Sequence, residues 1–272
     1  MTATAPTAHR QVGLLTASMR RTRIELLRFL RTREQVLFTF SLPLALMVLL
    51  TTVLDGEIGD TGVSFSTYLL AGLTASVALN VGVADLAPQL AMDKDDGTVK
   101  RLAGTPMPPA AYLLGKLGSV IVVATAQAAA LIALGALAFD ADLPSGGQLV
   151  TFTWVFLLGL TSAVLLGMSI STIATNPRSA GAVVTFPFII LQFISGIWFI
   201  FSDLPTWLQN VASIFPLRWM ALGMRASFLP DSFAAVEPGG GWQLGTVALV
   251  LGAWTVVGLG FVVARFRLRV ER

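Results

Sequence analysis

Few residues of this chain could perform covalent or metal chemistry. The 272 residues include no cysteine, which excludes thiolate nucleophiles, disulfides and thiolate metal sites. The one histidine, His9, lies in a polar N-terminal segment and cannot form a multi-histidine metal site. Gly115 and Lys116 are followed by Leu117 and no glycine-rich loop precedes them, so the chain has no P-loop for ATP. The sequence therefore predicts no catalytic residue, no metal site and no cofactor in this chain.

The densest acidic group is formed by Asp93, Asp95 and Asp96. A membrane-embedded enzyme that modifies lipids would need such a polar group at a membrane face, and this is the candidate. No histidine or second motif accompanies it. Asp85, shortly before it, is interpreted as a charge at the membrane interface and not as part of a proton relay. A lipid-modifying enzyme is therefore kept only as an alternative.

Long uncharged runs must position the polar residues. Apolar residues make up 55% of the sequence and charged residues 12%, against about 25% charged residues in a soluble domain. A helix needs about 20 apolar residues to cross a membrane. Six runs without Asp, Glu, Lys or Arg have this length: 36–54, 65–84, 117–139, 149–174, 179–201 and 242–264. We predict an all-α integral membrane protein with six transmembrane helices in domain 36–264, between segments 1–35 and 265–272.

The basic residues indicate the orientation of these spans. An even number of spans places both termini on one side, and all of the 18 lysines and arginines except Arg218 and Arg225 fall on that side. The positive-inside rule makes it the cytoplasmic side. This distribution explains the basic pI without nucleic-acid binding. The excess of arginine over lysine, with abundant alanine and glycine, favours a bacterial source and therefore the bacterial plasma (inner) membrane.

Residues 12–30 predict an amphipathic helix on the cytoplasmic membrane surface. One face carries Val12, Leu15, Met19, Leu26, Phe29 and Leu30, and the opposite face carries Arg20, Arg21, Arg28 and Arg31. Such a helix anchors the first span, binds a partner, or does both.

The external segment 202–241 is unusually apolar for an aqueous loop. Its pieces 205–214 and 217–228 are too short to cross a membrane. They predict a re-entrant helical hairpin, which is tolerable where protein covers its ends. The alternative is a pair of interfacial helices within the aromatic belt. The marking residues of this hairpin are Pro205, Trp207, Pro216 and Trp219.

Polar and aromatic side chains within the spans are the candidates for a substrate path. Asn80, Gln127 and Gln192 are interpreted first as interhelical hydrogen-bonding residues. The aromatic-rich run 179–201 could line an apolar path, although bulk facing lipid explains its composition equally well. The candidate path consists of Asn80, Phe186, Gln192, Phe193 and Trp198.

Two stretches carry a resemblance to a known family. Residues 96–106, Asp-Gly-Thr-Val-Lys-Arg-Leu-Ala-Gly-Thr-Pro, resemble the E-x-G-T-x-x-R-L-x-x-T-P coupling segment of type-2 ABC exporter permeases, with Asp96 close to the usual acidic position. Residues 193–199, Phe-Ile-Ser-Gly-Ile-Trp-Phe, followed by Leu-Pro and Trp-Leu at 204–208 and Phe-Pro-Leu at 215–217, are similar to a second run of that family. The order and spacing of these stretches along six spans extend the resemblance over the whole chain.

The resemblance implies a machine of several subunits. A separate cytoplasmic ABC ATPase would bind ATP and Mg²⁺, and two permease chains, as a homodimer, would enclose the path. The coupling segment would seat in a groove of the ATPase together with the amphipathic helix, with polar contacts from Lys100 and Arg101 and apolar contacts from Val99 and Leu102. The implied coupling residues are Asp96, Gly97, Thr98, Val99, Lys100, Arg101, Leu102, Thr105 and Pro106.

The substrate class follows less directly. The chain resembles the drug and antibiotic exporters more than the polysaccharide exporters, chiefly in its Ser-Gly-Ile-Trp-Phe stretch. We therefore expect export of a hydrophobic or amphipathic drug, antibiotic or lipid-like molecule from the cytoplasm or inner leaflet. Export of a polysaccharide or glycolipid by the same architecture is the alternative. A transporter independent of ATP would usually show internal repeats, and the two halves show none by eye.

Overall fold

The computed structural model describes residues 13–54, 56–59, 61–105, 107–173 and 177–270. Its elements are helical. In chain order they are α1 (Leu14–Arg31), α2 (Arg33–Val53), α3 (Phe65–Leu79), the π-helical η1 (Asn80–Asp85), α4 (Leu86–Asp95), α5 (Thr98–Ala103), α6 (Pro109–Ala138), α7 (Gly147–Ile173), α8 (Pro177–Ile194), η2 (Phe201–Asp203), α9 (Thr206–Ala212), α10 (Pro216–Phe228), η3 (Asp231–Val236) and α11 (Leu244–Val270).

Several helical runs are long and apolar enough to cross a membrane. Those identified in the described part of the chain are Arg33–Val53, Phe65–Asp95, Ala110–Ala138, Gly147–Thr172 and Leu244–Ala264. They correspond to five of the six uncharged runs, so the prediction of an all-helical, multi-pass membrane protein is confirmed. The remaining run, 179–201, overlaps most of α8, and its crossing of the membrane stays a prediction.

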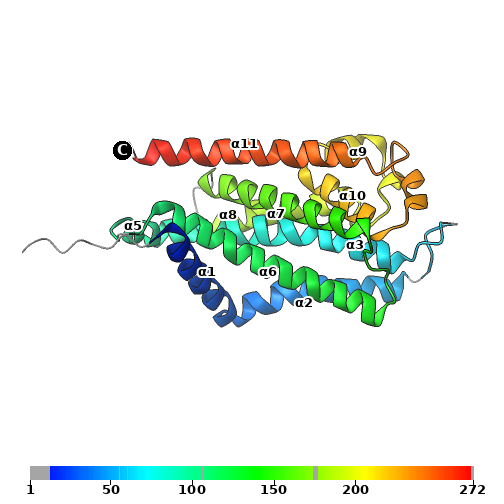
Figure 1. Cartoon of the computed structure of the whole chain (residues 1–272), viewed down its shortest axis with the longest axis horizontal. Helices are drawn as coiled ribbons and strands as arrows, with labels where there is room; N and C mark the ends of the chain where they lie inside the picture. Colours follow the sequence, from blue (N-terminus) through cyan, green and yellow to red (C-terminus); the bar gives the residue numbers. More distant parts are fainter. Residues whose placement is uncertain (1–12, 55, 60, 106, 174–176, 271–272) are drawn as a thin grey trace, which may run out of the picture.

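The molecule has two distinct ends (Figure 1). The long helices lie side by side along its longest axis. One end, here called the α5 end, carries α1, α5 and the C-terminal end of α11. The other, the hairpin end, carries the connections that follow α2 and α6, together with α9.

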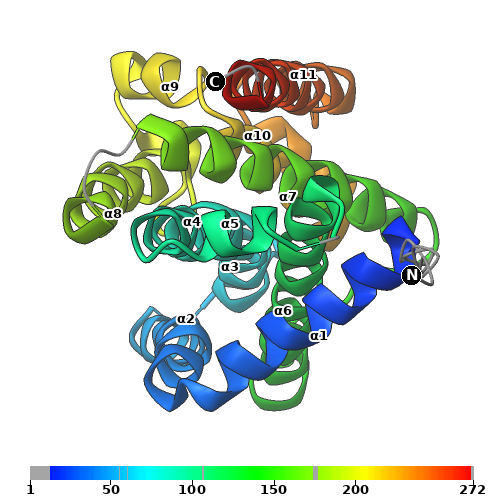
Figure 2. The ribbon, with the colours of Figure 1, turned by 90° about the vertical axis from the view of Figure 1, so that its left-hand side faces the viewer.

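A central helical run, Phe65–Asp95, is formed by α3, η1 and α4, and most of its residues are buried. In the end-on view, α3 and α4 lie in the middle of the other helices (Figure 2). A Cβ atom added to Gly167 of α7 would lie 2.1 Å from the carbonyl oxygen of Gly82 in η1. Only glycine at position 167 permits this approach, which packs the π-helical turn tightly against α7.

The uncharged runs predict a charged loop, 85–116, between the second and third spans. This prediction is wrong in part. The helix continues through Asp85 and Asp93 to Asp95, and α6 begins at Pro109, eight residues before the predicted start at residue 117. In the sequence, the charged residues Asp85 and Lys116 set the limits of the second and third uncharged runs. In the folded chain Asp93 and Lys116 are buried and form an ion pair, so both helices extend beyond those charges. The sequence pattern predicts a short helix over 98–103 that is stopped by Gly104 and Pro106, and the structure confirms this helix as α5.

The predicted run 179–201 is helical only as far as Ile194. Gly196 adopts a left-handed φ of 74°, and the chain leaves the helix there. Carbonyl oxygens released by this turn are satisfied by side chains. The Tyr68 hydroxyl donates to the carbonyls of Gly196 (3.1 Å) and Phe199 (3.0 Å), and Nη1 of Arg225 donates to that of Gly196 (2.9 Å). The Ser-Gly-Ile-Trp-Phe stretch is therefore a turn held by side-chain hydrogen bonds and not part of a longer helix.

The two helices of the predicted hairpin differ in their surroundings. In α9, Trp207 is exposed, whereas in α10 every residue except Trp219 is buried. Helix α10 packs against α3, α7 and α11. Protein therefore covers α10, whereas α9 keeps an exposed face, and the choice between a re-entrant and an interfacial hairpin stays a prediction.

Candidate functional site

A cavity of about 570 Å³ lies between α2, η1 and α8 and includes one residue of α6. It is lined by four of the five residues predicted for the substrate path: Asn80, Gln192, Phe193 and Trp198. Phe186 is not among the lining residues, and its side chain is 69% exposed elsewhere on α8. Four of the five predicted residues therefore lie on one cavity, and their role as a substrate path stays a prediction.

The cavity wall is mainly apolar and aromatic, and it opens at the surface of the molecule. Phe188 of α8 is buried against it, whereas Phe38 of α2 lines it and is 75% exposed. Phe193 and Phe199 are also exposed lining residues. Figure 2 shows α2 and α8 on the same side of the central run. The cavity is thus a lateral groove between two apolar helices, of the size that holds a drug-like molecule.

Polar side chains line one part of this cavity and join its helices. The Asn80 amide donates to Oγ of Ser76 (3.4 Å), and its Oδ1 accepts from Nε2 of Gln192 on α8 (3.5 Å). Gln127 of α6 donates from Nε2 to the carbonyl oxygen of Thr39 on α2 (2.5 Å). The interpretation of Asn80, Gln127 and Gln192 as interhelical hydrogen-bonding residues is confirmed, and each also lines the cavity.

Asp85 is the one acidic residue among those lining the cavity. It is the last residue of the π-helical turn η1, and such turns are frequent at functional sites. Its Oδ2 accepts a hydrogen bond from the Thr39 hydroxyl (3.3 Å), and among the described residues no basic side chain pairs with it. The helix continues ten residues beyond it and its carboxylate faces α2, so its interpretation as an interfacial charge stays a prediction.

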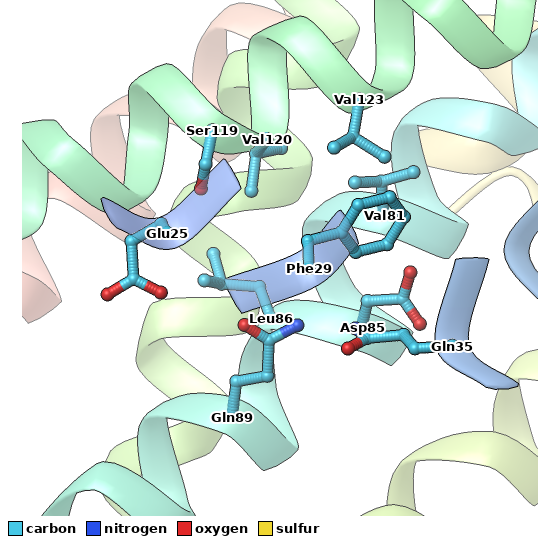
Figure 3. Close-up of a pocket in the computed structure, with 10 residues that line it drawn as sticks. All are labelled: Glu25, Phe29, Gln35, Val81, Asp85, Leu86, Gln89, Ser119, Val120 and Val123. Atoms are coloured by element: carbon cyan, nitrogen blue, oxygen red, sulfur yellow. The ribbon is translucent and has the colours of Figure 1, made fainter. Parts of the chain in front are cut away.

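A small pocket of about 30 Å³ adjoins this position, with room for one or two water molecules (Figure 3). Asp85 and Gln35 line both the pocket and the cavity. In the close-up their side chains lie near each other, whereas Glu25 lies apart on α1. The pocket thus extends the polar part of the cavity toward α1 and α6.

At the α5 end, five charged residues form what we call the Asp93 cluster: Glu25, Asp93, Lys116, Arg21 and Arg28. The fully buried Asp93 accepts from Nη1 of Arg28 (2.8 Å) and from the Tyr112 hydroxyl (2.8 Å), and it lies 2.9 Å from Nζ of Lys116. Glu25 pairs with Lys116 (2.8 Å) and with Arg21. The hydrogen bond to Asp93 raises the pKa of Arg28 above its usual value. These pairs tie α1, α4 and α6 together.

The orientation of α1 differs from the predicted one. Arg21 and Arg28 were predicted on a face opposite the apolar residues, away from the membrane, but they pair with buried carboxylates because Glu25 and Asp93 need cationic partners. The apolar Leu15, Met19 and Leu30 are exposed, whereas Leu26 and Phe29 pack against the core. Arg20 and Arg31 are exposed, and Val12 lies outside the described residues.

The sequence did not identify the Asp93 cluster. Its available signal was the spacing of four between Arg21 and Glu25, which places them on one helical face. The three carboxylates once considered for an enzyme do not form one site. Asp93 forms ion pairs with Arg28 and Lys116, whereas Asp95 and Asp96 are exposed. Within the described residues, no group of three His, Cys, Asp or Glu side chains is placed to hold a metal ion.

The coupling segment is a short, exposed turn of helix directly after α4. Gly97 adopts a left-handed φ of 73°, which favours glycine and reverses the chain between α4 and α5. Asp96 accepts a hydrogen bond from the backbone nitrogen of Thr98 (2.8 Å), and the hydrogen bonds from Thr98 lower the pKa of Asp96 below its usual value. This turn fixes the direction in which α5 leaves the helical bundle.

The side chains of α5 divide between the bundle and its surface. Lys100 and Arg101 are exposed, and Nη2 of Arg101 donates to the Thr98 hydroxyl (3.1 Å). Val99 and Leu102 are half-buried and pack against the core, so only part of each is available to a partner. Thr105 is exposed, and Pro106 lies outside the described residues.

At the hairpin end, a second ionic group consists of Arg218, Arg225 and Glu237, here called the Glu237 cluster. Glu237 accepts from Arg225 (2.5 Å) and from Arg218 (3.1 Å), and all three side chains are buried. Burial alone would raise the pKa of Glu237, but the two guanidinium groups lower it below its usual value. The sequence counted these arginines as external loop charges. Their spacing of seven on one helix was the signal that they share a face.

The predicted hairpin residues lie at the beginnings and on the faces of α9 and α10. Pro205 precedes α9, and Pro216 is the first residue of α10, where a missing N–H costs nothing. Trp219 donates from Nε1 to the carbonyl of Ser213 (2.8 Å), whereas Trp207 is exposed. These residues shape the hairpin, which positions Arg225 against the turn at Gly196.

Comparisons with known proteins agree with this architecture. The model of the family described as ABC-2 type transporter matches residues 17–229. The probable multidrug ABC transporter permease YbhR of Escherichia coli K12 is 26% identical over 168 residues, which are 60% of this chain and 44% of YbhR. The putative transport permease YvfS of Bacillus subtilis 168 is 21% identical over 192 residues, which are 71% of this chain and 77% of YvfS. The matched region thus spans less than half the length of YbhR.

Proposed function

The chain belongs to the ABC-2 type transporter family, and we propose that it is the permease subunit of an exporter for hydrophobic or amphipathic molecules. A separate ABC ATPase binds ATP and Mg²⁺ and drives transport from the cytoplasm or inner leaflet. This chain contributes no catalytic residue and no cofactor of its own.

The observation that carries this proposal is the lateral cavity between α2 and α8. Its volume of about 570 Å³ suits a drug-sized molecule, and its aromatic wall offers apolar contact with a few polar groups for orientation. Four predicted path residues line it, in a chain whose family moves substrates across membranes. The apolar wall disfavours a polysaccharide. The neutralised Asp93 disfavours the lipid-modifying enzyme.

The proposed orientation places the α5 end in the cytoplasm of a bacterium and the hairpin end outside the plasma membrane. The Asp93 cluster, Lys100 and Arg101 then lie on the side rich in basic residues, as the positive-inside rule requires. Helix α8 serves as the fifth span in chain order and completes the set of six, and both termini are cytoplasmic. The buried α10 enters the outer leaflet as the inner arm of a re-entrant hairpin covered by protein.

Coupling to the ATPase is proposed to run through α5. Lys100 and Arg101 face outward and contact the ATPase, together with the exposed parts of Val99 and Leu102. Helix α1 joins this docking face, since Glu25 and Arg28 attach it to the same cluster that holds α4. Helix α4 continues directly into η1, so a displacement of α5 would move Asp85 and Asn80 in the cavity wall.

A second copy of the chain is proposed to complete the path. The cavity is open on the side where Phe38 and Phe193 are exposed, and a homodimer would enclose it between two α2–α8 faces. ATP-driven closure of the two ATPases would then move substrate outward between the two permeases. Membrane lipid covers the remaining apolar faces.

Transport by the reconstituted complex tests this function. The chain and its cognate ABC ATPase would be placed together in vesicles with the ATPase outside, and uptake of a fluorescent hydrophobic dye would be followed. Uptake should require hydrolysable ATP. Phe188→Trp, which fills the cavity, should reduce uptake several-fold, whereas the matched variant Phe186→Trp on the exposed face of α8 should not. Failure to form a complex with any ABC ATPase, or uptake without ATP, would contradict the proposal.

A further inference from the structure

The charge of Asp85 has no counterpart in the described part of the chain. Its one hydrogen-bond donor is the neutral hydroxyl of Thr39, at 3.3 Å. An ionised carboxylate away from water is costly unless a cation or several donors accompany it. Asp85 lines the cavity, so a molecule bound there could supply the missing cation.

A second acceptor is linked to Asp85 through Thr39. Gln127 is 1% exposed, lines the same cavity, and donates from Nε2 to the carbonyl oxygen of Thr39. Its Oε1 has no hydrogen-bond partner among the described residues. Thr39 therefore connects two groups, the Asp85 carboxylate and the Gln127 amide oxygen, that can both accept hydrogen bonds from a ligand. A buried acceptor without a partner in the chain can be satisfied by a bound group.

The remaining wall indicates what else the ligand carries. Phe38, Phe188 and Phe193 present aromatic rings, which suit an apolar body and attract an organic cation. A bare metal ion does not fit, because hard cations take six or more oxygen ligands and no group of three His, Cys, Asp or Glu side chains in the described part of the chain is placed to hold one. An ammonium group with N–H donors matches both acceptors.

We propose that the cavity binds a hydrophobic molecule through a protonated amine, with Asp85 as the counter-charge and Gln127 Oε1 as the second acceptor. This inference rests on the proposed export function and names its substrate class, a lipophilic amine. The same chemistry is found in a free amphiphilic amine and in the headgroup of phosphatidylethanolamine, so the test distinguishes these two sources.

The test compares two probes that differ in one group. Monodansylcadaverine carries a primary amine, and its N-acetyl derivative has the same fluorescent body without the charge. Both would be titrated into the full chain in nanodiscs of phosphatidylglycerol. The wild type should bind the amine roughly tenfold to a hundredfold more tightly, as expected for a charge-assisted hydrogen bond. Asp85→Asn should remove this preference, and Asp85→Glu should retain it.

Two controls test whether the effect is specific to the Asp85 charge and whether the amine comes from a lipid headgroup. Asp95→Asn removes an exposed carboxylate from the same helical run and should leave the preference intact. Adding phosphatidylethanolamine to the nanodiscs should weaken amine binding if the lipid headgroup is the natural source and leave it unchanged if the source is a free amphiphile. Equal affinity of the wild type for the two probes would overturn the inference, as would a preference that persists in Asp85→Asn.

ATP-driven transport by the complex with the ATPase separates this inference from the proposed function. Transport of the acetylated probe without any amine preference would refute the inference and leave the exporter standing. Amine preference without ATP-dependent transport of either probe would support the binding site and refute the exporter.

Discussion

Asp85 and Asp93 lie eight residues apart on one helical run, yet their surroundings differ. Asp93 is surrounded by Arg28, Lys116 and Tyr112, all within 2.9 Å. Asp85 receives one hydroxyl at 3.3 Å. The first carboxylate is satisfied by the chain itself, whereas the second is left for something outside the chain. The difference separates charges that hold the helices together from charges that face a partner.

The same division extends over the rest of the molecule. At the hairpin end, Glu237 pairs with both Arg218 and Arg225 within the fold. At the α5 end, Lys100 and Arg101 project from α5 without a carboxylate partner among the described residues. Substitutions of charges that are paired within the fold should therefore change stability. Substitutions of charges that face a partner should change binding or coupling.

The largest loss of stability is expected for Glu237→Gln. It leaves Arg218 and Arg225 buried without a carboxylate, and breaking a buried ion pair costs about 3 to 5 kcal/mol, with the upper end expected here. Unfolding in detergent at neutral pH, compared with the wild type, measures this free energy. A loss below about 1 kcal/mol would contradict a structural role for the cluster.

The effect of Glu237→Gln should also depend on pH. Because the pKa of Glu237 is lowered in the folded chain, its contribution is present above the ordinary value near 4.5 and is lost as pH falls through the lowered value. The stability difference between wild type and variant should thus be full at pH 7 and shrink on acidification below about 4.5. A difference that does not change with pH would indicate a packing effect and not a charge effect.

Asp93→Asn should cost less, about 3 kcal/mol, the lower end for a broken buried pair. Lys116 keeps its pair with Glu25, and the amide can still accept from Tyr112. The same unfolding measurement applies. Asp95→Asn is the matched control on the same helix, since Asp95 is exposed, and it should change stability by no more than about 0.5 kcal/mol. Equal effects of the two variants would refute the distinction between buried and exposed carboxylates.

Much of the helical architecture could be predicted because membrane spans depend on local composition. Uncharged runs located the long helices, and Gly104 correctly indicated the end of α5. The prediction failed where charge occurs inside the fold. The runs stopped at Asp85 and Lys116, although both helices continue past them.

The candidate site could be predicted only in part for a similar reason. Asn80 and Gln192 were recognisable as polar residues in apolar runs, and they do line the cavity. The pairing of Asp93 with Lys116 and the isolation of Asp85 depend on tertiary contacts between α1, α4 and α6, which no local pattern encodes. The orientation of Phe186 away from the cavity is likewise set by how α8 packs.

Asp85→Asn should behave differently from Asp93→Asn. An amide retains the hydrogen bond from Thr39 and removes a charge that lacks a cation, so the stability should rise or change by less than about 1 kcal/mol. The unfolding measurement used for Asp93→Asn gives a direct comparison. A loss above about 2 kcal/mol would mean that the Asp85 charge is satisfied within the fold, and the contrast between the two carboxylates would disappear.

The smallest effect on stability is expected for the double variant Lys100→Glu with Arg101→Glu. Both side chains are exposed, so the free energy of unfolding should change by no more than about 0.5 kcal/mol. Stimulation of the ATPase by the permease should nevertheless be lost, because reversed charges at α5 repel the surface that the native residues attract. Asp203→Lys, at an exposed position of the hairpin end, is the control and should leave stimulation intact. If the double variant stimulates the ATPase as the wild type does, α5 is not the docking element. If it unfolds, its exposed charges support the fold, and the division between the two classes of charge fails at the α5 end.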